Sequence, residues 1–196
     1  MFKLQFKYLS FFFGIISILS FFNIIYAYYL NLYLNLDTYY YSLIISLIVS
    51  ILFYKIKQIK KKFSIFDKIL TVFLGYLLIP VVLSIPFYFS IYNLTFLDSY
   101  FEAISGFTST GFTIFENIKN IDQSLIIWRS STQWIGGLYF LFSIIFLIDI
   151  YDENFKKTLT NFISFDSSEI FKQAIKIFLL YSVLTLIIFI ILNIFS

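Results

Sequence analysis

A run of small and hydroxyl-bearing residues, Phe101–Thr113, interrupts the middle of this very hydrophobic chain. At its centre Thr108, Ser109, Thr110 and Gly111 follow one another. The run lies between two segments that are long and apolar enough to cross a membrane. Such residues suit a re-entrant pore loop, whose non-helical backbone turns carbonyl oxygens toward a desolvated cation. Because such backbone is tolerated at membrane depth only where it lines a cavity or is buried in protein, the run predicts a cation pore loop held by the surrounding helices.

The segment around this run has the composition of a short helix followed by an extended stretch that leads the chain back to the outer side. Residues 93–124 are too many for a tight turn and too apolar for a solvated loop. We expect a helix over 97–107 to dip into the membrane from outside, with Gly106 letting the chain leave it and the helix C-terminus turned toward a cation. Residues 108–113 would then return in extended form, with Gly111 supplying backbone angles that other residues adopt at a cost. Such spacing is common in ordinary loops, so the prediction depends on the flanking spans.

Two carboxylates fall within the expected short helix. Asp98 lies near its N-terminus, where a carboxylate complements the helix dipole, and Glu102 lies farther along. A charge at full membrane depth costs roughly 2.5–3.5 kcal/mol on insertion scales, so Glu102 would need a partner there. Arg129, near the start of the next span, could supply it, or both residues could lie at the outer interface. The sequence leaves these two alternatives open, and a direct ion-ligand role for Glu102 is less favoured than either.

A second unusual run, Trp128–Gly137, lies in the span after the loop. Paired glycines in a membrane helix permit close backbone packing or a hinge. We favour close packing of Gly136 and Gly137 behind the pore loop. We expect Trp128 and Trp134 to be interfacial anchors.

The composition excludes most soluble and catalytic classes. The chain has 196 residues, 60% of them hydrophobic, which indicates an integral membrane protein in contact with the lipid bilayer. Cys and His are absent, which excludes disulfides, thiol catalysis, zinc sites with Cys or His ligands and a Ser-His-Asp triad. No expected span holds two carboxylates, so we expect neither an enzyme nor a catalytic residue. The net charge of +3 does not indicate nucleic-acid binding, because the lysines gather in loops between spans.

The apolar runs predict an all-α membrane protein with about five transmembrane helices, one re-entrant pore helix and a filter loop. Pro80 and Pro86, the only prolines, fall in the third span, where each removes a backbone donor and can kink the helix. Asp166, with Glu169 three residues later, resembles a helix N-cap before the last span. The expected spans are about 8–30, 38–54, 66–92, 125–148 and 170–194.

The positive charges indicate the orientation of the chain in the membrane, and the order of the spans indicates its domains. With the N-terminus in the cytoplasm, five spans put all but Lys119 and Arg129 of the 14 Lys and Arg residues on the cytoplasmic side. The basic run Lys55–Lys62 then indicates topology rather than a lipid or partner site, and the pore loop lies outside. The expected domains are a helix pair with its basic loop (1–62), a helix–pore loop–helix repeat (63–150), and a cytoplasmic loop with the first helix of a second, incomplete repeat (151–196).

Two separated motifs in this order carry a family resemblance. The first is Tyr100–Gly111, and the second comprises Trp128–Ser130 and Gln133–Gly137. At these residues the sequence resembles the Trk/Ktr/HKT potassium transporter superfamily, most closely the bacterial TrkH type. The span order also fits, with spans one and two resembling the extra N-terminal pair of that family.

The resemblance implies that the protein moves K⁺, sometimes with Na⁺, across the bacterial inner membrane, and that no cofactor other than the transported ion is involved. Members form homodimers, and in bacteria a cytosolic nucleotide-binding regulatory subunit of the TrkA type gates them. By this resemblance K⁺ would bind at Thr110 and Gly111. The filter quarter would comprise Thr108, Ser109, Thr110, Gly111 and Phe112, and its supporting residues would be Glu102, Gly106, Arg129, Gly136 and Gly137.

The chain departs from the family in its number of pore loops. The family builds its pore from four non-identical repeats, but residues 1–97 and 138–196 contain no second Thr/Ser-Thr-Gly loop. One loop supplies a quarter of a carbonyl ring, so we expect a fragment that needs further repeats. Two alternatives stay open: a homotetrameric cation channel with one pore loop per chain, and a non-transporting membrane protein such as a sensor input or an assembly factor.

Overall fold

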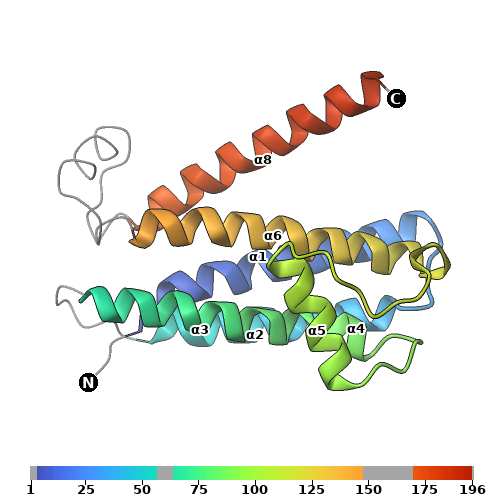
Figure 1. Ribbon diagram of the computed structural model, residues 1–196, viewed down its shortest axis with the longest axis horizontal. Helices are drawn as coiled ribbons and strands as arrows, with labels where there is room; N and C mark the ends of the chain where they lie inside the picture. The colour runs from blue at the N-terminus through green and yellow to red at the C-terminus, as the bar shows by residue number, and fades with distance from the viewer. Residues whose placement is uncertain (1–3, 57–63, 148–169, 196) are drawn as a thin grey trace. The chain divides into compact units, whose positions relative to one another are not determined.

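The computed structural model describes residues 4–56, 64–147 and 170–195, and the regular structure within these ranges is helical (Figure 1). The basic run 57–62 and the expected N-cap at Asp166 and Glu169 lie outside the described residues. The chain forms two compact units, residues 1–139 and 140–196. The candidate pore loop belongs to the first unit.

Five helical segments are long and apolar enough to cross a membrane, which confirms the expected all-α membrane protein. The shorter α5 lies between α4 and α6 in the chain and runs across the direction of α1, α2 and α3 (Figure 1). It confirms the short helix expected over 97–107. The helices are α1 (Phe6–Tyr29), α2 (Leu36–Lys55), α3 (Ile65–Leu83), α4 (Ile85–Tyr88), α5 (Phe96–Phe107), α6 (Gln123–Leu147) and α8 (Ile170–Phe195), with a 3-10 turn at Ile118–Asn120.

The third span is interrupted near its end, two residues before Pro86, in agreement with the expected helix-breaking effect of proline. Pro80 lies inside α3, and Pro86 occupies the first turn of α4, where a missing backbone N–H costs little. The break falls at Ser84, whose amide donates to the Pro80 carbonyl at 2.8 Å and whose hydroxyl donates to the Val81 carbonyl, also at 2.8 Å. The span therefore ends at Tyr88, earlier than the expected residue 92.

The helices α1 and α2 form an antiparallel hairpin with a seam of serines. The hydroxyls of Ser10 and Ser50 each donate to the other's backbone carbonyl at 2.9 Å. Farther along, Ser20 donates to Ser42 at 3.1 Å, and Gly14 faces Ser50 with only ordinary contact for an added Cβ, at 3.4 Å. Small residues of this kind let membrane helices approach closely while each hydroxyl keeps a partner.

A polar cluster fixes this hairpin to the segments around the candidate loop. The Asn35 side chain donates to Asp122 at 3.0 Å and accepts from the Ile91 amide at 3.1 Å. Ser124 donates its single proton to Asp122 at 2.5 Å, so the Tyr39 hydroxyl must be the donor in its 2.8 Å contact with Ser124. The N-terminal hairpin is thus held at the start of α6 as well as along its own seam.

Candidate functional site

The first turn of α5 is closed by a side-chain cap. The Thr95 hydroxyl accepts from the Asp98 amide at 3.2 Å and donates to the Asp98 carboxylate at 2.6 Å. A carboxylate in the first turn also complements the positive end of the helix dipole. This confirms the expected placement of Asp98 near the N-terminus of the short helix.

The last turn of α5 ends in a Schellman motif centred on Ser109, not on Gly106 as expected. The Ser109 amide donates to the Gly106 carbonyl at 2.9 Å, and the Thr110 amide reaches the Ser105 carbonyl at 3.1 Å. Ser109 has φ 56°, the left-handed conformation that glycine more often supplies at this position. Gly106 remains helical.

Gly106 is needed for packing instead. A Cβ at this position would lie 2.1 Å from the Thr132 hydroxyl oxygen of α6. A Cβ on Gly136 would lie 1.9 Å from the Phe107 carbonyl oxygen, so α6 approaches the end of α5 at backbone distance. This confirms the expected close packing of Gly136 behind the loop, while Gly137 is half-buried.

The four residues after α5 expose carbonyls that no hydrogen bond of the described residues reaches. These residues are Thr108, Ser109, Thr110 and Gly111, and all four are exposed. Gly111 has φ +80°, and nothing lies within 4 Å of a Cβ built on it, so its glycine identity serves the backbone rather than space. Carbonyl oxygens of this kind can replace part of a cation's hydration shell.

The threonine hydroxyls of the loop turn back toward α5. Thr108 donates to the Ile104 carbonyl at 2.7 Å, and Thr110 lies 3.3 Å from the Ser105 carbonyl and 3.2 Å from its hydroxyl. Ser105 in turn donates to the Phe112 carbonyl at 2.6 Å. Phe112 thus differs from the four residues before it, because its carbonyl contacts the scaffold. The hydroxyls brace the loop and leave its backbone oxygens exposed.

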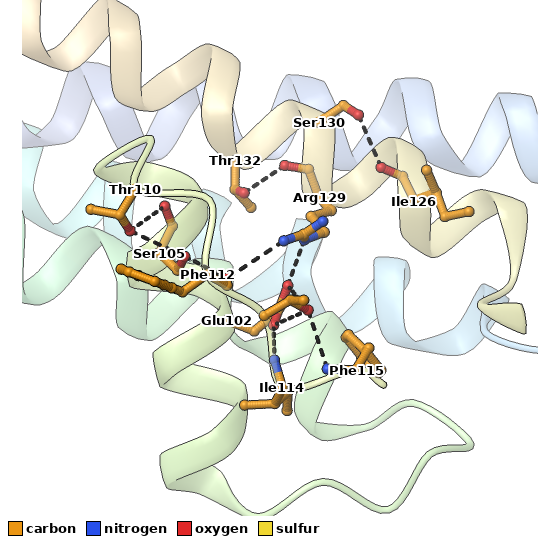
Figure 2. A network of polar contacts seen from close by, with 11 residues as sticks. Glu102, Ser105, Thr110, Phe112, Ile114, Phe115, Ile126, Arg129, Ser130 and Thr132 are labelled. Carbon is orange, nitrogen blue, oxygen red and sulfur yellow. Dashed lines mark hydrogen bonds and ion pairs between the residues drawn. The ribbon is translucent and has the colours of Figure 1, made fainter. Parts of the chain in front are cut away.

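A buried ion pair holds the returning chain (Figure 2). Glu102 is fully buried, and its Oε1 accepts from Arg129 Nε at 2.5 Å. Its Oε2 accepts from the Thr113 hydroxyl at 3.0 Å and from the Ile114 amide at 3.1 Å. Arg129 Nη2 also lies 3.5 Å from the Phe112 carbonyl. Of the two alternatives left open by the sequence, the structure shows the paired one, with Glu102 anchoring the loop.

Trp128 does not lie at an interface. Its side chain is fully buried, where its ring lies 6.1 Å from that of Tyr39, so the interfacial-anchor prediction is wrong for this residue. The indole Nε1 donates to the Leu83 carbonyl at 3.0 Å, at the break between α3 and α4. Burial of an indole requires such a partner. Trp134 is half-buried.

Comparison with known proteins assigns the chain to a family. The cation transport protein family TrkH matches residues 39–196, which include the whole candidate loop and its supports. The chain belongs to this family. No solved structure matches it.

Individual curated proteins match over shorter stretches. An uncharacterized cation transporter of Methanocaldococcus jannaschii is 31% identical over 127 residues, which cover 64% of this chain and 27% of that protein. The Trk system potassium uptake protein TrkG of Escherichia coli is 33% identical over 73 residues, or 37% and 15% of the two chains. The Trk system potassium uptake protein TrkH of Salmonella typhimurium is 32% identical over 90 residues, or 45% and 19%. The chain therefore spans about a quarter or less of the length of these curated relatives.

Three residues of the site were not singled out from the sequence. Ser105 and Thr113 bond the returning backbone and Glu102, and Thr132 occupies the notch at Gly106. Ser105 and Thr113 lie within the unusual run, so their type was a usable signal. Thr132 lies within the second unusual run, but its type did not indicate this role, which depends on how closely α6 approaches α5.

Proposed function

We propose that the loop after α5 forms one side of a potassium pore, and that the protein takes part in potassium uptake across the bacterial plasma membrane. The observation that carries this is the row of exposed carbonyls at Thr108–Gly111, which no described residue pairs. We place K⁺ at Thr110 and Gly111. The preceding helix supports a cation there, because its C-terminal end carries partial negative charge.

Anchors at both ends of the loop support ion binding there. Carbonyl oxygens of a filter replace the hydration shell of the ion, so their placement matters for binding. Here Glu102 and Arg129 bind the backbone after the loop, and the Schellman turn at Ser109 fixes the backbone where the loop begins. The names of the relatives from Escherichia coli and Salmonella typhimurium support K⁺ as the ion.

One loop can contact an ion from one side only. The remaining oxygens must come from other loops, either of further repeats in a longer polypeptide or of other copies of this chain. Residues 63–150 would form the helix–pore loop–helix repeat. The distribution of Lys and Arg supports a cytoplasmic N-terminus and an outward-facing loop. A nucleotide-binding regulatory subunit and homodimer formation are further parts of the proposal, carried over from the family resemblance.

Growth rescue at limiting K⁺ tests the proposal in a bacterium that lacks its own K⁺ uptake systems. The 196-residue chain is expressed by itself and in any longer form that its coding DNA specifies. Gly111→Ser is introduced into each, because a side chain strains the backbone at φ +80° without meeting a steric obstacle. Gly14→Ser, at a glycine with only ordinary contact for a Cβ, is the matched control.

We expect rescue by the transport-competent form, weaker rescue with Gly111→Ser and unchanged rescue with Gly14→Ser. Equal rescue by Gly111→Ser at equal membrane abundance would contradict a pore role for the loop. If the 196-residue chain rescues alone and migrates as a tetramer in mild detergent, copies of this chain supply the other loops.

A further inference from the structure

An aromatic cluster joins the N-terminal helix to the end of α5. Its centre is Tyr139 of α6, which is fully buried. The Tyr139 ring centroid lies 4.8 Å from that of Phe12, 4.9 Å from that of Tyr76 and 5.3 Å from that of Phe107. Tyr8 of α1 adds a contact at 5.7 Å. Rings at these separations and tilted angles attract one another through their quadrupoles.

The position of the Tyr139 ring is fixed against α3. Its hydroxyl donates to the Val72 carbonyl at 2.8 Å. That hydroxyl fills the notch at Gly75, where a Cβ would lie 1.8 Å from the hydroxyl oxygen. The ring is therefore held by a backbone oxygen at one end and has neighbouring rings around it. It can shift only if these neighbours shift.

The far side of the cluster is the last residue of α5. Phe107 is buried, its ring contacts both Tyr76 and Tyr139, and its carbonyl lies against Gly136. Ser109, the turn residue of the loop, follows two positions later. Because close-packed interiors transmit small displacements, Phe107 connects the Tyr139 ring to the backbone of Thr108–Gly111 through packing contacts.

The near side of the cluster belongs to α1, outside the pore repeat. Phe12 is fully buried against Tyr139. The same helix is held to the start of α6 by Asn23, whose amide donates to the Ser124 carbonyl at 3.2 Å. Thus α1 contacts α6 near both ends of the stretch that supports the loop.

We infer that Tyr139 is a positioning residue for the loop after α5, and that α1 helps to set the position of the loop through Phe12. The expected effect on ion discrimination rests on the proposed pore function. The effect on loop position does not, because it follows from packing alone.

A single-cysteine reporter tests the loop position directly, since the chain contains no cysteine. Ser109→Cys is labelled with a membrane-impermeant maleimide in cells that express the 196-residue chain. Labelling rates are compared in the parent, in Tyr139→Phe, which removes the bond to Val72, and in Phe12→Leu, which reduces the ring contact. Phe22→Leu is the matched control, because Phe22 lies on the same helix and is 60% exposed. Competition between Rb⁺ and Na⁺ for uptake is measured in the same variants with Ser109 intact, in the transport-competent form.

We expect Tyr139→Phe and Phe12→Leu to change the labelling rate by about 2- to 12-fold, the range that corresponds to one hydrogen bond for the first variant and one aromatic contact for the second. We expect the Rb⁺/Na⁺ ratio to change with it and Phe22→Leu to leave both unchanged. Reduced abundance with unaltered labelling and ratio in the remaining protein would overturn the inference, because it describes a purely structural role. Altered labelling with an unaltered ratio would overturn the part that concerns ion discrimination. If even the parent takes up no ion, the proposed function fails, while the labelling rates still decide whether Tyr139 positions the loop.

Discussion

The α1–α2 seam and the loop after α5 both place polar groups inside an apolar protein, but with different chemistry. Along the seam the backbone is regular, and uncharged serines return their hydroxyls to nearby carbonyls. Around the loop the backbone leaves the helix, and a fully buried carboxylate with an arginine partner holds it. A helix satisfies its own backbone groups in lipid, whereas irregular backbone needs donors from elsewhere. Charge is therefore used where the chain must depart from helical geometry.

Of the substitutions considered, removal of the buried carboxylate should give the largest difference in stability between the loop and the seam. Glu102→Ala leaves Arg129 without its partner and frees the Thr113 and Ile114 donors. Breaking a buried pair in this way costs about 3–5 kcal/mol. We expect a large loss of membrane abundance and of thermal stability in detergent. Glu116→Ala, at an exposed glutamate of the following loop, is the control. Equal stability of the two variants would mean that the ion pair does not hold the loop.

Adding one methyl group to a glycine tests the close approach of backbones. Gly136→Ala forces the Phe107 carbonyl away, and overpacking of this kind costs about 1–3 kcal/mol. Gly14→Ala in the seam meets only ordinary contact and should change stability little. The apparent melting temperature in detergent measures both variants. If Gly14→Ala proved the more destabilising, the seam would be the tighter of the two regions.

Replacing the strained turn residue should stabilise the loop. Ser109 holds a left-handed backbone that glycine adopts without steric cost, so Ser109→Gly is expected to add about 0.5–1 kcal/mol. The shift in melting temperature is compared with that of Ser17→Gly, a helical position in α1 where glycine should destabilise. Destabilisation at both positions would contradict the strain assigned to Ser109.

The smallest effect is expected in the seam. Ser10→Ala and Ser50→Ala each remove one hydroxyl donor, and hydrogen bonds between membrane helices contribute about 0.6 kcal/mol on average. We expect each variant to unfold at only slightly lower concentrations of sodium dodecyl sulphate. Ser130→Ala, at an exposed hydroxyl bonded within α6, serves as the control for loss of a local bond. A loss as large as that of Glu102→Ala would erase the contrast between the regions.

The sequence predicted the parts of the fold that depend only on the lipid surroundings of the chain. Lipid requires apolar runs of a certain length, so five spans and the short helix before the loop were recognisable. A charge within an apolar segment requires a partner, and pairing of Glu102 with Arg129 was one of the two alternatives that the sequence left open. The family motifs placed the loop between its supports.

The remaining features depend on contacts between elements. Gly106 was expected to end the helix, but it is needed for the approach of Thr132, which only the packed structure shows. The turn at Ser109 uses a residue type that the sequence does not favour for a left-handed backbone. Trp128 has the type of an interfacial anchor, yet the break at Ser84 gives its indole a buried acceptor at Leu83.

The bonds from Glu102 to Thr113 and Ile114 close a small ring of backbone around the loop. Its circumference is set by the number of residues between those anchors, as in a compact Ω-loop whose neck is fixed. An insertion or deletion of one residue between 103 and 112 would therefore change the direction in which the exposed carbonyl oxygens point, even if every remaining side chain were preserved. Residues 116–118 lie beyond the neck and are exposed, so the chain can vary in length there. The loop is thus defined by its length as much as by its composition.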